Sequence, residues 1–131
     1  MSTLLLEIVT PERTVYAQEV NMVSVKGADG ELGILPNHIP LVTPLRIAPV
    51  IVKKDGVSEK IAVSGGFIEI RKDKVVILAE SAELASNVDV TRAEAAKKRA
   101  EDRLSTKQSD VDQVRAELAL QRALNRININ K

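Results

Sequence analysis

Glycine and proline are confined to the first half of this 131-residue chain. All six glycines and all five prolines lie at or before Gly66, whereas residues 89–131 contain neither and hold seven alanines. Glycine and proline serve turns and strand ends, while alanine favours the helix and proline interrupts it. The two halves therefore require different backbones. We expect an α+β chain in two parts, with a β domain over residues 1–84 and a helical hairpin over residues 85–131.

Short apolar runs rich in β-branched residues alternate with turn residues between Thr3 and Glu80, which predicts a β-sandwich or barrel. The expected strands are Leu4–Val9, Glu19–Val25, Glu31–Leu35, Ile47–Lys53, Glu59–Ser64, Phe67–Arg71 and Lys74–Ala79. Asp29-Gly30 and Asp55-Gly56 predict hairpin turns, because glycine adopts positive φ without a Cβ penalty. Gly65-Gly66 predicts a turn or a bulge. Residues 67–71 alternate between apolar and charged side chains, so one face of this strand should be buried and the other exposed to solvent.

Residues 29–44 contain three of the five prolines, two glycines and several apolar side chains. The prolines should prevent continuous pairing with neighbouring strands, and the apolar residues should keep the segment ordered. One interpretation is a docking edge for a partner, since ordered loops of this kind are commonly functional. The alternative is a crossover loop whose prolines protect a sheet edge.

After Glu80 the apolar residues recur at helical spacing. Asp89 and the capping-box spacing of Thr91 and Glu94 predict a helix over Val90–Leu104. Ser109 and Asp112 repeat this spacing before a second helix that extends to Ile127. The polar break Thr106–Asp110 is short, so the two helices should form an antiparallel hairpin.

Each predicted helix carries three arginines at positions i, i+7 and i+11, which share one face. They are Arg92, Arg99 and Arg103 in the first helix and Arg115, Arg122 and Arg126 in the second. One interpretation is a solvated face balanced by nearby acidic residues. The other is a site for an anionic partner, either a polyphosphate or an acidic helix of another protein.

Several function classes are disfavoured by composition. Residues 1–88 carry nine basic and eleven acidic side chains, net −2, and residues 89–131 carry ten and seven, net +3. This balance and the single Phe and Tyr argue against nucleic-acid binding. One histidine and no cysteine argue against a hydrolytic site, and metal-ligand spacing is missing. The Leu4–Leu6 run is stopped by Glu7, too short for a membrane span. We expect a soluble, non-catalytic protein without a required cofactor.

The chain resembles the epsilon subunit of F-type ATP synthase. The resemblance rests on Gly30–Leu41 (GELGILPNHIPL), on Thr10-Pro11 and Thr14-Val15-Tyr16 before it, and on Val63-Ser64-Gly65-Gly66-Phe67 after it. Residues 10–15 and 35–38 look most similar to the cyanobacterial and chloroplast branch, which would be part of the CF1 assembly at the thylakoid.

This resemblance implies a flattened β-sandwich of ten strands that binds the gamma subunit and rests on the c-subunit ring. The helical hairpin would fold against the sandwich or extend into the alpha/beta catalytic head and inhibit ATP hydrolysis. The protein would be a peripheral membrane protein on the cytoplasmic or stromal face of an energy-coupling membrane. Glu31 and His38 are then expected at rotor contacts, and Arg103, Arg115 and Arg122 at inhibitory contacts.

Some members of this family bind ATP as a regulatory ligand through a motif Ile/Leu-Asp-x-x-Arg-Ala. Residues 88–93 (VDVTRA) match it except for Val88 at the first position. The resemblance implies ATP contacts at Glu83, Asp89, Arg92, Arg99, Arg122 and Arg126. Asp89 also has an ordinary role as a helix N-cap, so its presence alone does not indicate a nucleotide.

Three functions remain open from the sequence. The chain is a rotor subunit of ATP synthase, an independent nucleotide-binding regulator whose hairpin closes around ATP, or an adaptor that presents a helical hairpin to unrelated partners. Copurification with gamma and the c ring would distinguish the first from the other two.

Overall fold

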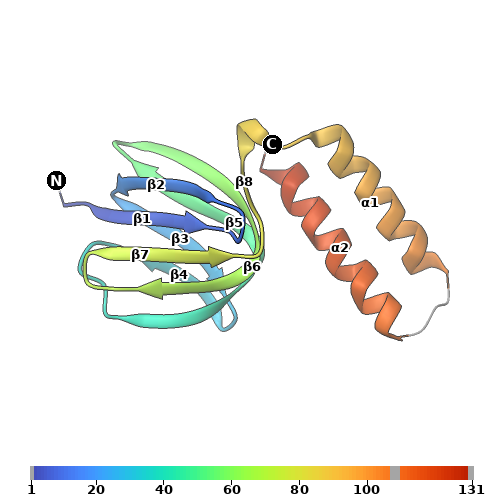
Figure 1. The fold of residues 1–131 in the computed structure, drawn as a ribbon, viewed down its shortest axis with the longest axis horizontal. Helices are drawn as coiled ribbons and strands as arrows, with labels where there is room; N and C mark the ends of the chain where they lie inside the picture. Colours follow the sequence, from blue (N-terminus) through green and yellow to red (C-terminus); the bar gives the residue numbers. More distant parts are fainter. Residues whose placement is uncertain (1, 107–109, 130–131) are drawn as a thin grey trace.

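The computed structural model describes residues 2–106 and 110–129. The strands are Leu4–Val9 (β1), Thr14–Val20 (β2), Met22–Gly27 (β3), Gly30–Ile34 (β4), Leu41–Lys54 (β5), Val57–Ile70 (β6), Lys74–Ala79 (β7) and Ala82–Leu84 (β8). A 3-10 turn, Ala85–Asn87, leads into helices Val90–Ser105 (α1) and Asp110–Asn128 (α2). A β-sandwich is thus followed by a helical hairpin, which confirms the expected fold class (Figure 1).

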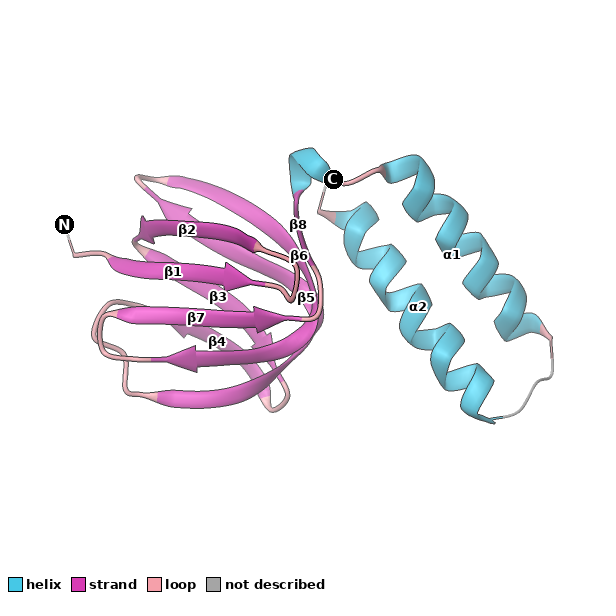
Figure 2. Cartoon of the chain, in the orientation of Figure 1, coloured by secondary structure: helices cyan, strands magenta, loops and turns pink. Residues whose placement is uncertain are grey.

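The strands are ordered β2-β1-β7-β6-β5-β3-β4, with β8 pairing with β6 outside this path. Neighbouring strands are antiparallel except for β1 and β7, which pair in parallel from Leu5 opposite Lys74 to Val9 opposite Leu78. The long strands β5 and β6 curve from one layer of the sandwich to the other (Figure 2). This continuity explains why the described part of the chain has eight strands instead of the ten that the resemblance implied.

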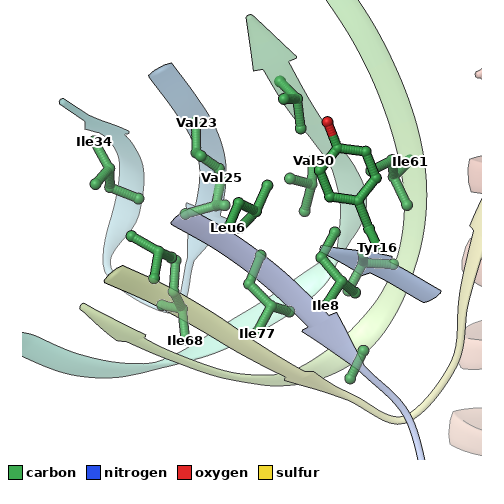
Figure 3. Packing of buried hydrophobic residues seen from close by; sticks show 14 of the residues in the cluster. Leu6, Ile8, Tyr16, Val23, Val25, Ile34, Val50, Ile61, Ile68 and Ile77 are labelled. Carbon is green, nitrogen blue, oxygen red and sulfur yellow. The ribbon is translucent and has the colours of Figure 1, made fainter. Parts of the chain in front are cut away.

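The core between the layers is aliphatic (Figure 3). Leu6 and Ile8 of β1 and Ile68 and Ile77 of β6 and β7 have 0% of their surface exposed. Tyr16 is the aromatic residue of this core, and burial raises the pKa of its hydroxyl, with a smaller contribution from the charge of Glu59. Alternate residues of the strands face inward, as the period of two requires.

Strand β6 bends at two glycines, Gly65 and Gly66. Gly66 has a φ of 115°, and a Cβ at this position would lie 2.0 Å from Leu78 O. Only a residue without a side chain allows β6 and β7 to approach this closely. Gly65 and Gly66 therefore bend a continuous strand, where the sequence predicted a break between two strands.

Both hairpin turns expected from Asp-Gly pairs are confirmed. Asp55 and Gly56 have φ values of 52° and 80° and connect β5 to β6. Ala28 and Asp29 connect β3 to β4, and the flanking Gly27 and Gly30 form a cross-strand pair. The positive φ of both Asp55 and Gly56 is typical of a two-residue turn that matches the strand twist.

The predicted interruption of strand pairing is confirmed at Pro36 and Pro40, which lie in the loop between β4 and β5, and is wrong at Pro44. Pro44 and Pro49 lie inside β5, opposite Phe67 and Ala62 of β6. The pairing of β3 with β5 shifts register between Ser24 and Gly27, opposite the part of β5 that contains Pro49. Because this part of the ladder is irregular, the missing N–H of proline costs little there.

Other strand boundaries differ from those predicted. Strands Leu4–Val9 and Lys74–Ala79 are confirmed. The single strand expected over Glu19–Val25 is wrong, because β2 ends at Val20 and β3 begins at Met22. The strand β8 was not predicted.

The helical hairpin is built on small residues. Ala93 and Ala100 of α1 and Ala116 and Ala123 of α2 are at most 3% exposed, so the two helices approach closely. Asp89 caps α1 by accepting a 3.0 Å hydrogen bond from Arg92 N, which places Thr91 inside the helix and makes the predicted Thr91–Glu94 capping box wrong. The predicted cap at Ser109 lies outside the described residues.

Candidate functional site

An exposed apolar row crosses the outer face of the sandwich. Phe67 of β6 and Leu78 of β7 lie opposite each other, and each has 53% of its surface exposed. Val9 pairs with Leu78, and Pro44 pairs with Phe67, so the four residues form one row across β1, β7, β6 and β5. A shallow surface hollow of about 400 Å³ adjoins this row. We call these four residues the apolar row.

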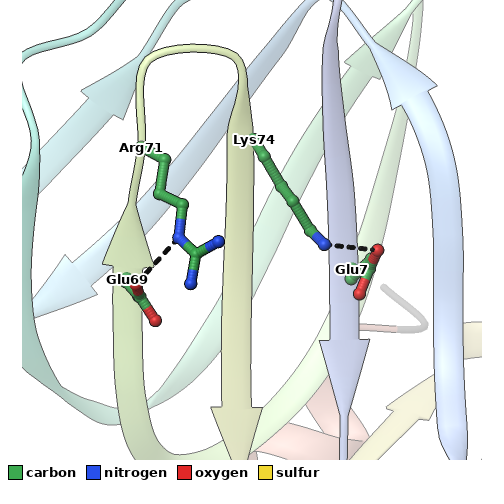
Figure 4. Close-up of polar contacts among 4 residues, drawn as sticks. All are labelled: Glu7, Glu69, Arg71 and Lys74. Carbon is green, nitrogen blue, oxygen red and sulfur yellow. Dashed lines mark hydrogen bonds and ion pairs between the residues drawn. The ribbon is translucent and has the colours of Figure 1, made fainter.

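Charged pairs flank the apolar row near the β6–β7 turn (Figure 4). Lys74 Nζ lies 3.1 Å from Glu7 Oε1, and Arg71 Nε lies 2.9 Å from Glu69 Oε1. An apolar centre with a polar rim is the usual composition of a protein interface. The outer face of β1, β7 and β6 therefore has the character of a docking surface.

A second exposed apolar surface lies on the loop between β4 and β5 and on the first two residues of β5. Leu35, Ile39 and Val42 are 58%, 80% and 65% exposed. The loop is nevertheless held in place, because Asn37 N donates a 2.9 Å hydrogen bond to Lys72 O. Asn37 has a φ of 67°, a conformation that asparagine tolerates better than most residues. We call residues 35–42 the apical loop.

The two predicted rotor contacts lie in different elements. Glu31 is exposed on the edge strand β4 and lines a hollow of about 230 Å³ together with Leu41 and Val42. His38 is half-buried in the apical loop, with Nδ1 2.7 Å from Ile39 O. Because a carbonyl oxygen only accepts, this contact requires the proton on Nδ1.

The helical hairpin rests on the sandwich through α2, which packs against β5 and β6 (Figure 1). In the strand register, Pro49, Ala62 and Glu83 are opposite one another on β5, β6 and β8, on the face away from the core. Ser64 shares this outer face, and Ala62 and Ser64 are each only 3% exposed. Small side chains thus form the seat of α2.

Two consecutive residues of α2 attach it to this seat. Asn125 Nδ2 donates a 3.1 Å hydrogen bond to Val63 O of β6. Arg126 Nε lies 2.5 Å from Glu83 Oε1 of β8. Of the six residues predicted to contact ATP, this ion pair brings together Glu83 and Arg126.

The remaining predicted arginines occupy different environments. Arg92, Arg99 and Arg103 are exposed along α1, and Arg115 is exposed on α2. Arg122 is half-buried on α2. Val114 and Leu118 lie one turn apart on the same helix and are 56% and 41% exposed. This part of α2 therefore offers both positive charge and apolar surface.

Sequence reasoning missed Asn125 and the apolar row. Asn125 is polar and lies in an amphipathic helix, where a solvent-facing position would be expected. Phe67 was on the charged side of an alternating strand, and an aromatic residue at such a position was the available signal for an exposed contact.

Within residues 2–106 and 110–129, no group of three or more His, Asp or Glu side chains is arranged to hold a metal ion. Neither described helix combines the length and the apolar character needed to cross a membrane.

Comparison with known proteins assigns both parts of the chain. Residues 3–85 match the family model described as ATP synthase, Delta/Epsilon chain, beta-sandwich domain. Residues 86–131 match the long alpha-helix domain of the same family. The ATP synthase epsilon chains of Bacillus thuringiensis (strain Al Hakam) and Bacillus velezensis are 59% and 57% identical over 129 residues, which is 98% of this chain and 97% and 98% of theirs.

Solved structures share the fold at much lower identity. A chain of the Euglena gracilis mitochondrial ATP synthase (OSCP/F1/c-ring) superposes with a TM-score of 0.79 at 20% identity, covering 92% of this chain and 77% of that one. A chain of the Tetrahymena thermophila enzyme (central stalk/c-ring) gives 0.70 at 12% identity, covering 98% and 96%. With two family models that together span residues 3–131, the chain belongs to the ATP synthase delta/epsilon chain family.

Proposed function

We propose that this chain is the epsilon subunit of an F-type ATP synthase, a non-catalytic part of the central stalk that couples rotation to ATP synthesis. The observation that carries the proposal is the identity of 57–59% to epsilon chains along almost the whole length of both proteins. The expected partners are the gamma subunit and the c-subunit ring. The protein would lie at the cytoplasmic face of an energy-coupling membrane, peripheral to the membrane-embedded part.

The cyanobacterial or chloroplast-like placement is not supported. The relatives described above come from Bacillus, and an epsilon chain of Brevibacillus brevis is 57% identical over 111 residues, 84% of each chain. The expected thylakoid location and CF1 assembly depended on that placement and lack support for the same reason.

The apolar row and the apical loop are the surfaces that we assign to rotor contacts. Both expose large apolar side chains at positions fixed by strand pairing or by a backbone hydrogen bond. His38 lies in the apical loop and Glu31 lines a hollow with Leu41 and Val42 of that loop, so both are proposed to lie at the same contacts.

Reconstitution tests this assignment. An ATP synthase depleted of its epsilon subunit should recover coupled synthesis when this chain is added, and the chain should copurify with gamma and the c ring. Replacing Phe67 and Leu78 by Ser should abolish copurification in a protein that still folds. Val57→Ser is the matched control, because Val57 is 68% exposed at the far β5–β6 turn. Equal loss with both variants would contradict the assignment.

The hairpin is proposed to inhibit ATP hydrolysis when it leaves the sandwich and enters the alpha/beta head. The exposed Arg103 and Arg115 and the half-buried Arg122 would then face acidic protein surface, with Val114 and Leu118 adding apolar contact. Replacing Arg103 and Arg115 by Ala should relieve inhibition at low salt and leave synthesis intact. The relief should shrink at high salt, since exposed charges are screened. An unchanged hydrolysis rate would leave the arginines as a solvated face.

ATP is proposed as a regulatory ligand of the folded hairpin, held by Glu83, Asp89, Arg92, Arg99, Arg122 and Arg126. The motif-like segment 88–93 and the contact of Arg126 with Glu83 support this proposal. Titration of the isolated protein with ATP, followed by calorimetry, tests it. Arg92→Ala should weaken binding, whereas Arg103→Ala should not, because Arg103 is outside the proposed set. Lack of heat with millimolar ATP would refute nucleotide binding and leave the rotor assignment untouched.

A further inference from the structure

Asn125 is a buried polar residue at the interface between the hairpin and the sandwich. Its side chain lies on α2, and only 6% of the residue is exposed. The amide nitrogen Nδ2 donates to Val63 O, but the carbonyl oxygen Oδ1 is buried without a hydrogen-bond partner among residues 2–106 and 110–129. A buried amide is normally satisfied at both ends, so this half-satisfied one requires an explanation.

The surroundings of Asn125 show why its amide matters for position. The seat of α2 contains the small residues Ala62 and Ser64, whose short side chains interlock little with a helix. Such a surface permits a helix to slide or rotate. The hydrogen bond from Asn125 to Val63 O, together with the contact of Arg126 with Glu83, fixes α2 against β6 and β8 in one register. The ion pair of Arg126 with Glu83 is partly exposed. The buried, directional contact that positions α2 is therefore the hydrogen bond of Asn125.

The two ends of the amide act in opposite directions on docking. A donated hydrogen bond replaces one made to water, so its net contribution is small. An acceptor that loses water and gains no partner carries the full desolvation penalty. The amide therefore specifies where α2 docks. It also makes docking weaker than it would be with an apolar side chain of the same size at position 125.

We propose that Asn125 is the positioning residue of the hairpin, and that its unpaired carbonyl keeps the docked and released states close in free energy. Release exposes the carbonyl to water and removes the penalty. Only the regulatory role of this release rests on the proposed function. Docking itself is a property of the isolated chain.

Thiol labelling measures docking directly, because the protein contains no cysteine. Ser64→Cys introduces a thiol beneath α2, where Ser64 is 3% exposed, and should react only when the hairpin opens. Ser58→Cys provides the reference, because Ser58 is exposed on the same strand. The ratio of the two labelling rates in the full chain reports the docking equilibrium.

Asn125→Leu should slow labelling of Ser64→Cys about tenfold, because leucine has nearly the same size and leaves no unpaired polar atom on α2. An unchanged or faster rate would overturn the proposal. Should Ser64→Cys itself disturb docking, Ala62→Cys reports the same opening from a neighbouring buried position.

Asn125→Asp supplies a second test. Its effect on labelling should depend on pH, which a change of side-chain size alone cannot produce. At neutral pH its carboxylate has no proton to donate to Val63 O, so labelling should accelerate at least tenfold. As the pH falls through the pKa of the new carboxyl, the protonated form donates in place of Nδ2 and labelling should slow again. Asn125→Leu retains Glu83 and Arg126 and therefore controls for their titration. A labelling ratio that is independent of pH in the Asp variant would overturn the proposal.

Hydrolysis measurements keep the two proposals distinguishable. If hairpin inhibition operates, the more firmly docked Asn125→Leu should relieve inhibition of ATP hydrolysis in the reconstituted enzyme. Slower labelling with unchanged hydrolysis would uphold the role of Asn125 and refute the proposed inhibition.

Discussion

Arg126 and Glu83 form an ion pair across the boundary between the hairpin and the sandwich, with Nε 2.5 Å from Oε1. The side chains are 31% and 30% exposed, so water screens the pair and its contribution should be about 0.2–1 kcal/mol. Glu83→Gln and Arg126→Gln should each speed labelling of Ser64→Cys by a factor of about 1.4 to 5. The double variant should do no more than either single one, since each already removes the pair. Arg115→Gln is the control, and fully additive effects would contradict a direct interaction.

Gly66→Ala should destabilise the sandwich by about 3 kcal/mol or more, because a Cβ would lie 2.0 Å from Leu78 O at a backbone φ of 115°. Gly56→Ala is the matched comparison. Gly56 also has positive φ, but a Cβ there would have no heavy atom within 4 Å, so the cost should be about 1 kcal/mol. Urea unfolding followed by circular dichroism measures both, and equal losses would show that the close approach of β6 and β7 is unimportant.

Tyr16 should make the protein lose stability in alkali. Its folded-state pKa is raised above the ordinary value of 10.0 by burial and then by Glu59. The folded protein therefore holds this proton more tightly than the unfolded chain, and the difference in stability is fully present below pH 10.0 and is lost as the pH rises toward the folded-state pKa. Tyr16→Phe should flatten that part of the profile. Parallel free energies of unfolding for the two proteins across the alkaline range would contradict this.

Truncation after Ser86 should leave a folded sandwich. The hairpin covers mainly small residues such as Ala62 and Ser64, so its removal exposes little apolar surface. The loss in free energy of unfolding should be no more than about 2 kcal/mol. Cooperative thermal unfolding of the fragment would support the division at residues 84 and 85, and a broad, non-cooperative transition would argue against two separable parts.

Local patterns predicted some elements closely and failed at others for identifiable reasons. Strands Leu4–Val9 and Lys74–Ala79 were recognised because continuous or alternating apolar residues mark a buried strand. The strand β2 was missed because only Tyr16 and Val20 of its residues are buried, which leaves a weak signal. The continuity of β5 and β6 was missed because prolines and glycines that usually end strands here lie within an irregular ladder or a bend.

The candidate site was less predictable than the fold. His38 and Glu31 were identified through resemblance, and the structure adds Leu41 and Val42 as apolar neighbours of Glu31. Asn125 could not be identified from its own helix, because its partner Val63 is 62 residues earlier in the sequence. Contacts of this kind depend on the tertiary arrangement, which a local pattern does not contain.

The parallel pairing of β1 with β7 also dictates an order of events during biosynthesis. The first strand to leave the ribosome cannot complete its pairing until residues 74–79 have emerged, because Leu5 lies opposite Lys74 and Val9 opposite Leu78. Chains are made from the N-terminus, so the sandwich can close only after residue 79 has emerged, and the helices emerge after it. The nascent α2 then meets a finished surface, and the hairpin is the last part of the protein to find its place.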